Sequence, residues 1–195
     1  MSKLYFRYGA MNSGKSTHLM QVAYNYEERG LRVVLLKPST DKKGGDKLVS
    51  RLGVTRKVDM VITAEDNIYE MIKEDLRHNK KLDCILVDEV QFMKAYQIDQ
   101  LFEIAVKMDI PVICYGLRTD FLMNGFEGST RLLLIAHSIE EMKTICKCGS
   151  KAVLNARKIK DKFVFEGEQI AIDNMDDVEY ESLCGKCYYK FKDNK

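Results

Sequence analysis

Short apolar runs alternate with amphipathic stretches through the first two thirds of the chain. Four of these runs have the length and composition of buried strands, at residues 4–8, 32–38, 84–88 and 111–116. Three stretches carry apolar side chains at helical spacing, at residues 17–29, 65–78 and 96–108. Strands that alternate with helices predict an α/β fold: a mainly parallel sheet flanked by helices, with ligands at the carboxyl ends of the strands.

The composition changes beyond about residue 140, where cysteines, lysines and acidic residues replace the long aliphatic runs. We therefore expect an α/β domain over residues 1–139 and a small second domain over residues 140–195. The chain has 195 residues, 46% of them hydrophobic, which is enough to bury a substantial core in the first domain.

Charge and hydropathy narrow the class of protein. The net charge of +2 offers no strongly basic surface for a nucleic-acid partner, and no apolar run is long enough for a membrane span. The amino-terminal segment MSKLYF lacks the apolar core of a signal peptide, which predicts a cytoplasmic protein. In that reducing compartment we expect the six cysteines to be thiols or metal ligands before disulfides.

The segment YGAMNSGKST lies between the first predicted strand and the first predicted helix. Its spacing matches the phosphate-binding pattern GxxxxGK[ST], in which backbone N–H groups and a helix N-terminus surround phosphate oxygens. Lys15 is expected to reach the β and γ phosphates of ATP or GTP, and Ser16 to bind Mg²⁺. The alternative is an ordinary glycine-containing turn. The predicted phosphate loop (P-loop) comprises Gly9, Ala10, Met11, Asn12, Ser13, Gly14, Lys15 and Ser16.

Two carboxylates, Asp88 and Glu89, follow the third predicted strand. An aspartate at this place is the usual second half of a P-loop site, where it holds Mg²⁺ or its water. Adjacent residues of an extended strand face opposite sides, so both carboxylates can serve one site only if the strand ends near Asp88. Glu89 is then placed to accept a proton from an attacking hydroxyl or to orient a water. The alternative is a solvated acid at a strand end.

Four cysteines form two close pairs, Cys146 with Cys148 and Cys184 with Cys187. Two such pairs are typical of a structural Zn²⁺ site with four thiolates, although the first pair is one residue tighter than the common CxxC. The second domain has few large aliphatic residues, so burial alone cannot stabilise it. Disulfides are the disfavoured alternative in a reducing compartment. Cys84 and Cys114 lie inside apolar runs and are expected to be small buried hydrophobic residues.

Several segments together resemble the zinc-containing cytosolic thymidine kinases: YGAMNSGKST, VDEVQF, CYGLRTDF, TICKCG, and EGEQ with the closing C-x-x-C. The resemblance covers almost the whole chain, in the same order. It implies a recombinase-type P-loop core joined to a zinc-ribbon-like domain. It also implies a homotetramer that transfers the γ-phosphate of ATP to the 5′-hydroxyl of thymidine, giving dTMP for DNA synthesis, with dTTP as a candidate feedback inhibitor.

The same resemblance implies roles for individual residues. Glu89 would be the general base acting on the 5′-hydroxyl and Asp88 the acid on the magnesium side. Together with Val90 and Gln91 of the same turn, they would also contribute to the binding of ATP and its phosphates. The residues implied around the nucleoside are Met11, Phe92, Leu117, Phe121, Phe126, Arg157 and Tyr180. Tyr180 matches the tyrosine of the family's lasso loop, which spans the zinc hairpins and reads thymine through backbone groups. Arg157 matches a basic residue that the family places near phosphate.

These residues also have ordinary structural interpretations. Apolar residues beside strands are usually core, which applies to Phe92, Leu117 and Met11, whereas Phe121 and Phe126 lie in a glycine-containing segment that favours a pocket. Tyr180 could be packing alone and Arg157 a solvated charge. His18 and His137 are most simply surface histidines.

Two departures from the family pattern fall in loops. The polar stretch STDKKGGDK at residues 39–47 is either a connector or a lid over the nucleotide, and it has Lys43 where the family usually has an arginine in a D-x-R arrangement. The lasso commonly contains paired glycines where this chain reads Ile172-Asp173-Asn174. Asp and Asn tolerate left-handed backbone better than most residues, so the turn is compatible with them.

The main alternative function is an ATP-dependent nucleic-acid-binding module, because P-loop cores and four-cysteine zinc folds occur in such proteins. The near-neutral charge, without a basic stripe interleaved with aromatic residues, argues against it. The same motifs are also compatible with a kinase for a different nucleoside and with a noncatalytic zinc-stapled interaction protein.

Overall fold

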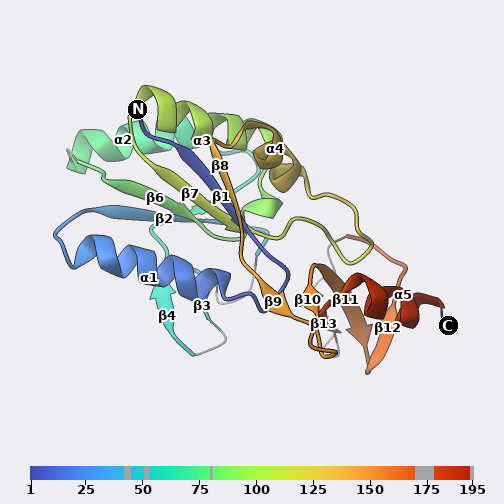
Figure 1. Cartoon of the computed structure of the whole chain (residues 1–195). Helices are drawn as coiled ribbons and strands as arrows, with labels where there is room; N and C mark the ends of the chain where they lie inside the picture. The colour runs from blue at the N-terminus through green and yellow to red at the C-terminus, as the bar shows by residue number, and fades with distance from the viewer. Residues whose placement is uncertain (42–44, 51–52, 80, 170–177, 194–195) are drawn as a thin grey trace.

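The central sheet is parallel at every pairing. The computed structural model describes residues 1–41, 45–50, 53–79, 81–169 and 178–193. The sheet has the strand order β5-β2-β6-β7-β1-β8 (Figure 1). Its strands are β1 (Leu4–Tyr8), β2 (Val33–Pro38), β5 (Met60–Ile62), β6 (Cys84–Val87), β7 (Val112–Gly116) and β8 (Ser138–Glu141). The predicted parallel α/β architecture is therefore confirmed, and the sequence prediction lacked only the two edge strands, β5 and β8.

Helices cover both faces of this sheet. One face carries α1 (Lys15–Glu27), and the opposite face carries α2 (Ile68–Asn79), α3 (Ala95–Lys107) and α4 (Glu127–Ile135) (Figure 1). The three predicted helices are present as α1, α2 and α3, with ends shifted by a few residues. The helix α4 has no counterpart in the sequence prediction.

Alternation along the strands divides the buried side chains between two hydrophobic cores. In β2, Val34 and Leu36 pack in the core beneath α2, α3 and α4, whereas Val33 and Leu35 pack in the core beneath α1. Both sets are almost fully buried, which accounts for the continuous apolar runs of the central strands. Each large aliphatic side chain buried in this way stabilises the fold by about 1.5–3 kcal/mol.

Cys84 and Cys114 lie in these cores and are fully buried, as expected for small hydrophobic residues. Burial raises the pKa of Cys84 to about 12, so this thiol stays protonated at neutral pH. Burial also raises the pKa of Cys114. Neither thiol has the ionised form that a reactive cysteine or metal ligand needs.

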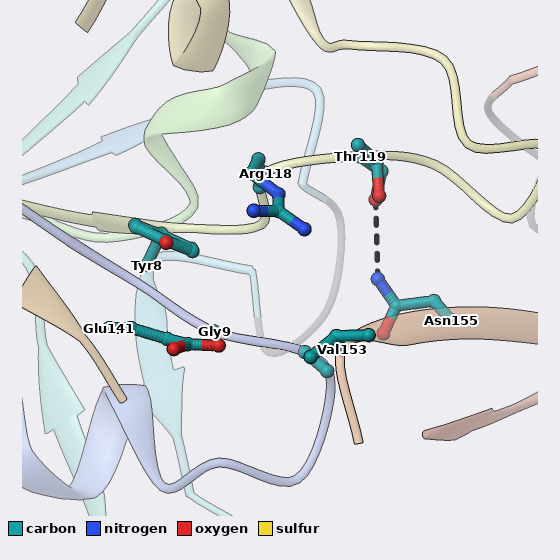
Figure 2. Close-up of a pocket in the computed structure, with 8 residues that line it drawn as sticks. Tyr8, Gly9, Arg118, Thr119, Glu141, Val153 and Asn155 are labelled. Carbon is teal, nitrogen blue, oxygen red and sulfur yellow. Dashed lines mark hydrogen bonds between the residues drawn. The ribbon is translucent and has the colours of Figure 1, made fainter. Parts of the chain in front are cut away.

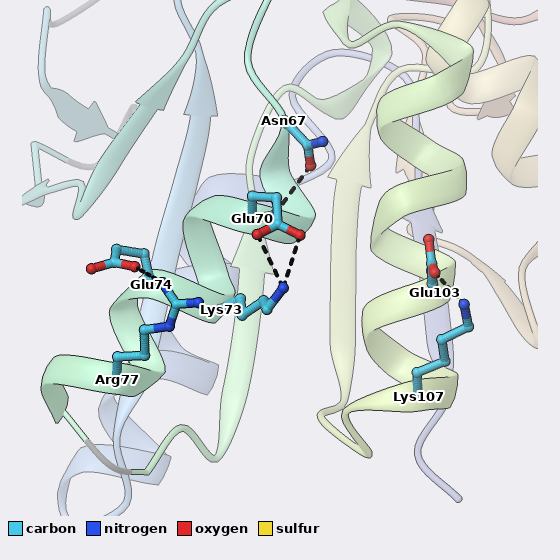
Figure 3. Close-up of polar contacts among 7 residues, drawn as sticks. All are labelled: Asn67, Glu70, Lys73, Glu74, Arg77, Glu103 and Lys107. Carbon is cyan, nitrogen blue, oxygen red and sulfur yellow. Dashed lines mark hydrogen bonds and ion pairs between the residues drawn. The ribbon is translucent and has the colours of Figure 1, made fainter.

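The outer surfaces of α2 and α3 carry ion pairs at helical spacing (Figure 3). Glu70 pairs with Lys73, and Glu74 pairs with Arg77, along α2. On α3, Glu103 pairs with Lys107. Exposed pairs of this kind contribute about 0.2–0.5 kcal/mol each, so the buried faces dominate the stability of this region.

A small hairpin follows the polar loop after β2. It consists of β3 (Lys47–Val49) and β4 (Thr55–Lys57), and it buries Leu48 against the core beneath α1. At the end of β2, the buried Lys37 pairs with Asp41 at 3.0 Å and donates to the carbonyl of Gly45 at 3.2 Å. Residues 42–44, which include Lys43, lie outside the described residues, so the choice between connector and lid stays open.

The second unit lies at the carboxyl ends of the strands (Figure 1). Its elements are the hairpin of β9 (Thr144–Ile145) and β10 (Lys151–Ala152), the antiparallel strands β11 (Leu154–Ile159), β12 (Lys162–Val164) and β13 (Val178–Leu183), and the helix α5 (Gly185–Asp193). The strand β8 pairs with β1, so the central sheet continues to Glu141, across the expected boundary at residue 139. Across the described parts of the chain, we find no helix with both the length and the apolar character that crossing a bilayer requires.

Candidate functional site

The P-loop runs from the end of β1 into the first turn of α1, as its pattern requires. Gly9 is buried, and a Cβ added there would lie 2.5 Å from the carbonyl oxygen of Met142, so only glycine fits. Gly14 has φ +78° and caps α1, a left-handed conformation that favours glycine. The loop therefore leads directly into the N-terminus of α1. The first N–H groups of a helix and the helix dipole favour the binding of an anion there.

Lys15 is buried against the loop that it follows. Its Nζ donates to the carbonyl oxygen of Ala10 at 3.0 Å and to that of Gly9 at 3.3 Å. The ammonium group is thus held beside the same loop that would surround phosphate. Phosphate oxygens are stronger acceptors for an ammonium than neutral carbonyls, so a bound nucleotide would compete well for this lysine.

A hydrogen bond joins the P-loop to the end of β6. The Ser16 hydroxyl donates to Oδ2 of Asp88 at 3.1 Å. Asp88 is only 4% exposed, and its Oδ1 has no hydrogen-bond partner within the part of the chain that the structure describes. Burial, and then the neighbouring Glu89, raise the pKa of Asp88 to about 7. A buried carboxylate with one unpartnered oxygen next to a hydroxyl is a donor set that fits Mg²⁺.

The strand β6 ends at Val87, so the turn that both carboxylates need is present. Glu89 has φ +47°, a left-handed conformation that is uncommon for glutamate, and it leads into the short 3₁₀ helix η1 (Val90–Phe92). Strained backbone of this kind costs about 1–3 kcal/mol and clusters at functional sites. Glu89 is half-buried beside the buried Asp88.

Gln91 connects Glu89 to the end of β7. Its Nε2 donates to Oε2 of Glu89 at 2.5 Å, and its Oε1 accepts from the N–H of Leu117 at 3.1 Å. Gln91 is buried, so these two contacts use both ends of its amide. The family resemblance implies that Gln91 lies in a phosphate-binding turn, and in the structure its side chain contacts the carboxylate of Glu89 and the N–H of Leu117.

Aromatic and aliphatic side chains gather next to this turn. Phe92 of η1 meets Phe126 edge-to-face, with ring centroids 5.6 Å apart. Leu117, Phe121 and Phe126 are buried, whereas Phe92 is half-buried. Met11, which follows the first two residues of the P-loop, is also half-buried. The structure thus brings the predicted apolar residues to the same end of the sheet as Asp88 and Glu89.

Arg157 is 4% exposed, so its interpretation as a solvated charge is wrong. Its guanidinium lies 3.7 Å from the ring centroid of Phe121, and its Nε donates to the hydroxyl of Tyr180 at 3.0 Å. Arg157 and Tyr180 are register partners in β11 and β13, which explains why the two side chains meet. Tyr180 is consequently a hydrogen-bonding partner and more than packing.

The segment that follows β12 is attached to the first domain by Gln169. Its Nε2 donates to Oδ2 of Asp120 at 3.1 Å and to the carbonyl of Gly125 at 3.3 Å. Its carbonyl accepts from Arg157 at 3.2 Å. Gln169 belongs to the EGEQ segment but was given no role from sequence. Residues 170–177, which include Ile172-Asp173-Asn174 of the expected lasso, lie outside the described residues.

The four cysteines of the second unit converge. The Sγ atoms of Cys146, Cys148, Cys184 and Cys187 all lie within 4.8 Å of one another. A Zn–S length of about 2.3 Å places tetrahedral thiolates about 3.8 Å apart, and the Sγ atoms of Cys148 and Cys184 are 3.6 Å apart. The described cysteines are all free thiols.

Electrostatics of this cluster fit a cation. Hydrogen bonds from Ser150 lower the pKa of Cys148 to about 6, so this sulfur is a thiolate at neutral pH. The pKa of Cys187 is raised to about 12, chiefly by its contacts with Cys148 and Cys184, because neighbouring sulfurs cannot all ionise without a counter-charge. Thiolate donors at this spacing suit Zn²⁺, which removes that conflict.

His18 and His137 are exposed, as expected. His18 lies 3.0 Å through Nδ1 from the hydroxyl of Tyr115, and His137 accepts from the N–H of Leu4 at 3.0 Å. These contacts are consistent with structural roles.

A small pocket lies where the P-loop, the segment after β7 and β11 meet (Figure 2). Arg118 extends over the ring of Tyr8, 5.4 Å from its centroid. The pocket is lined by Tyr8, Gly9, Ala10, Arg118, Thr119, Glu141, Val153 and Asn155. Outside the P-loop, the sequence predicts no site role for these lining residues. No local motif marks them, because they become neighbours only when the fold brings the three segments together.

Comparison with known proteins places the chain in a family. The sequence model of the family described as Thymidine kinase matches residues 2–188. Thymidine kinase from Shewanella oneidensis is 46% identical over 193 residues, covering 98% of each chain. Thymidine kinase from Francisella tularensis subsp. tularensis is 44% identical over 191 residues, covering 95% of this chain and 96% of its own.

Likeness to solved structures is more distant. A DNA replication initiation factor aligns with 73% of this chain and 40% of its own, at 16% identity and a TM-score of 0.41, which is too low to carry an argument. The match to the family, in contrast, extends from the P-loop to the last cysteine pair. The chain belongs to the thymidine kinase family.

Proposed function

We propose that this chain transfers the γ-phosphate of ATP to the 5′-hydroxyl of thymidine, giving dTMP and ADP. Family membership supports the substrates, and one structural observation supports the chemistry. The hydrogen bond from Ser16 to Asp88 joins the P-loop to the strand end that Glu89 follows, which supports a site shared by a phosphate group and a candidate base.

The donor side of the reaction is electrostatic. Backbone N–H groups of the P-loop, the N-terminus of α1 and the ammonium of Lys15 would hold the phosphates of ATP and balance charge that develops on them. Ser16 and Asp88 are the residues that would hold Mg²⁺, and the bound ion supplies charge neutralisation at the phosphate oxygens.

Glu89 is the proposed base on the acceptor side. It would accept the proton of the 5′-hydroxyl as the oxygen attacks the terminal phosphorus, a contribution of about 10²- to 10⁴-fold in rate. The left-handed backbone at Glu89 and the hydrogen bond from Gln91 restrict where the carboxylate can lie. We thus propose Gln91 as the group that orients Glu89, in place of a direct role with phosphate.

The nucleoside would occupy the space beside Phe92 and Phe126. Apolar walls from Met11, Leu117, Phe92, Phe121 and Phe126 are suited to a flat pyrimidine with a methyl group. Tyr180 and Arg157 support the segment expected to close over it, the lasso. Cys146, Cys148, Cys184 and Cys187 would hold a structural Zn²⁺ that fixes the two ends of this segment and lowers the entropic cost of closing it.

Further properties are proposed on the resemblance to the family alone. These are a cytoplasmic location, a homotetrameric assembly, feedback inhibition by dTTP and the lack of a stable nucleic-acid or membrane partner.

The proposed function is tested by incubating the protein with labelled ATP, Mg²⁺ and a panel of nucleosides, followed by separation of the products. We expect labelled dTMP as the main product and little label on purine nucleosides. Preferential labelling of another nucleoside would change the acceptor. ATP hydrolysis stimulated by single-stranded DNA, with no nucleotide product, would instead favour the nucleic-acid-binding module.

A further inference from the structure

The strands β11 and β13 form a ribbon, and side chains on one face of it contact the first domain at two places. Asn155 and Ser182 are register partners across this ribbon, and both are buried, at 4% and 5% exposed. The next partners on the same face are Arg157 and Tyr180. Buried polar residues in a sheet need specific partners, so the contacts of Asn155 and Ser182 require an explanation.

Both side chains bind the backbone of a single P-loop residue. The N–H of Met11 donates to Oδ1 of Asn155 at 2.8 Å, and the Ser182 hydroxyl donates to the carbonyl of Met11 at 2.5 Å. The next residue, Asn12, receives a longer hydrogen bond through its carbonyl from Thr144 of β9, at 3.3 Å. The middle of the P-loop is therefore held from outside, by the unit that carries the four cysteines.

Asn155 also reaches the segment that leads to the apolar walls. Its Nδ2 donates to the carbonyl of Thr119 at 3.2 Å, the dashed contact in Figure 2. Two residues later in the chain, Phe121 lies under Arg157, which is two residues after Asn155 in β11. One face of the ribbon thus touches the phosphate side and the nucleoside side of the site.

We propose that Asn155 and Ser182 are positioning residues that preset the P-loop for phosphate and couple nucleotide binding to nucleoside binding. This inference rests on the proposed function. A loop that surrounds phosphate must keep successive peptides oriented, and ordering one residue's backbone costs about 1–2 kcal/mol. Fixing the N–H and the carbonyl of Met11 before the ligand arrives removes part of that cost from binding.

The coupling follows from the shared ribbon. A nucleoside bound against Phe121 would restrict Arg157 and with it β11, and the ribbon of β11 and β13 holds Met11 through Asn155 and Ser182. When one ligand has ordered the site, the second ligand pays a smaller entropic cost to bind. The factor by which thymidine strengthens ADP binding must equal the factor by which ADP strengthens thymidine binding.

The test measures the dissociation constant of ADP with Mg²⁺ by calorimetry, with and without saturating thymidine, in the full chain loaded with zinc. Ser182→Ala removes one hydroxyl, and we expect ADP to bind about threefold to tenfold more weakly. We also expect thymidine to strengthen ADP binding less than in the unmodified protein. Ser182→Thr retains the hydroxyl and should restore most of both effects. Glu179→Ala, at an exposed position on β13, is the matched control and should change neither.

Zinc content and thermal unfolding establish that each variant is folded. Asn155→Ala gives a second perturbation, which removes the acceptor for the Met11 N–H and the donor to the Thr119 carbonyl. ADP affinity in folded Ser182→Ala and Asn155→Ala equal to that of the unmodified protein would overturn the proposal. So would an equal loss in thymidine affinity measured without ADP, because that indicates general loosening of the ribbon. Failure of the unmodified protein to form dTMP would refute the proposed function instead, and ADP binding would still report on Met11.

Discussion

The two units of the molecule are held together by different forces. In the first, strands buried on both faces pack against helices, so hydrophobic burial alone supplies a large core. Among the described residues of the second unit, its core comprises seven buried residues, and two of them are the cysteines Cys146 and Cys184. Such a core is too small to hold antiparallel strands by burial, so we expect the second unit to depend on the Zn²⁺ proposed for its four cysteines. Stability that comes from a metal can be removed selectively.

The division of chemistry follows the same boundary. The P-loop, Asp88 and Glu89 all lie at strand ends of the first unit, where a rigid sheet fixes them. Arg157 and Tyr180 lie on the second unit, beside the segment expected to cover the nucleoside. Changes in the first unit should therefore act mainly on turnover, and changes in the second mainly on substrate affinity.

The largest expected effect comes from Glu89→Gln. This change keeps the size and the hydrogen-bonding ability of the side chain but removes the base, so kcat should fall by about 10²-fold or more. Thymidine affinity, measured by calorimetry, should stay within about twofold. Glu103→Gln, at an exposed pair on α3, serves as control. Unchanged turnover in Glu89→Gln would remove this residue from the mechanism.

Removal of zinc should affect the second unit and leave the sheet intact. Mild chelation under reducing conditions should raise the KM for thymidine by about tenfold or more, because the segment between the cysteine pairs loses its fixed ends. The KM for ATP should rise less, through the contacts to Met11. Far-ultraviolet circular dichroism should retain most of its helical signal, and added Zn²⁺ should restore the kinetics. A chelated enzyme with normal kinetics would contradict the metal dependence of this unit.

Arg157→Lys tests whether the planar guanidinium group of Arg157, and not only its positive charge, is needed at this buried position. Lysine retains the charge but cannot stack a planar group on Phe121 while donating to Tyr180. We expect the KM for thymidine to rise about fivefold to tenfold, with kcat changed less. Arg131→Lys, at an exposed pair on α4, is the matched control and should behave as the unmodified protein. A larger effect on kcat than on KM would place Arg157 with the phosphates.

Tyr188→Phe should give the smallest effect. Tyr188 directly follows Cys187, a proposed zinc ligand, and its hydroxyl donates to the carbonyl of Phe121 at 2.7 Å, which links the cysteine cluster to an apolar wall. Loss of this one hydrogen bond should raise the KM for thymidine about twofold to fivefold and leave kcat unchanged. The exposed neighbour in Tyr189→Phe provides the comparison. Equal kinetics for the two variants would show that the hydrogen bond from Tyr188 does not help to position Phe121.

Local patterns predicted the central strands, three helices, the P-loop and the cysteine set, because each depends on residues close together in the chain. The edge strand Ser138–Glu141 reads SIEE and has no buried run, so its pairing with β1 has no local signal. The α4 segment contains Gly128, Ser129 and Thr130, which are weak helix formers. Gly128 is required by close packing against the carbonyl of Met93, where an added Cβ would lie 2.9 Å away.

The polar contacts between the units could not be predicted from sequence. Asn155 and Arg157 occupy positions i and i+2 of one strand, so the sequence predicts that they share a face. Their partners across the ribbon, however, are set by the register of β11 with β13. Gln91 illustrates the same limit, since it lies two residues from Glu89 in the chain while its second contact, to Leu117, is on another strand end. Resemblance to a family supplied roles for Arg157 and Gln91 but not their contacts, and it supplied no role for Asn155.

We infer that a metal-dependent unit holds one side of the site, whereas the residues proposed for the chemistry lie on a sheet stabilised by hydrophobic burial. Backbone hydrogen exchange, compared in zinc-loaded and chelated protein without substrates, tests it most directly. We expect amides of β11 and β13, and those of Met11 and residues 119–125, to lose protection on chelation, whereas those of β1, β6 and β7 should keep theirs. Equal loss of protection in both units, or unchanged exchange at Met11, would contradict it.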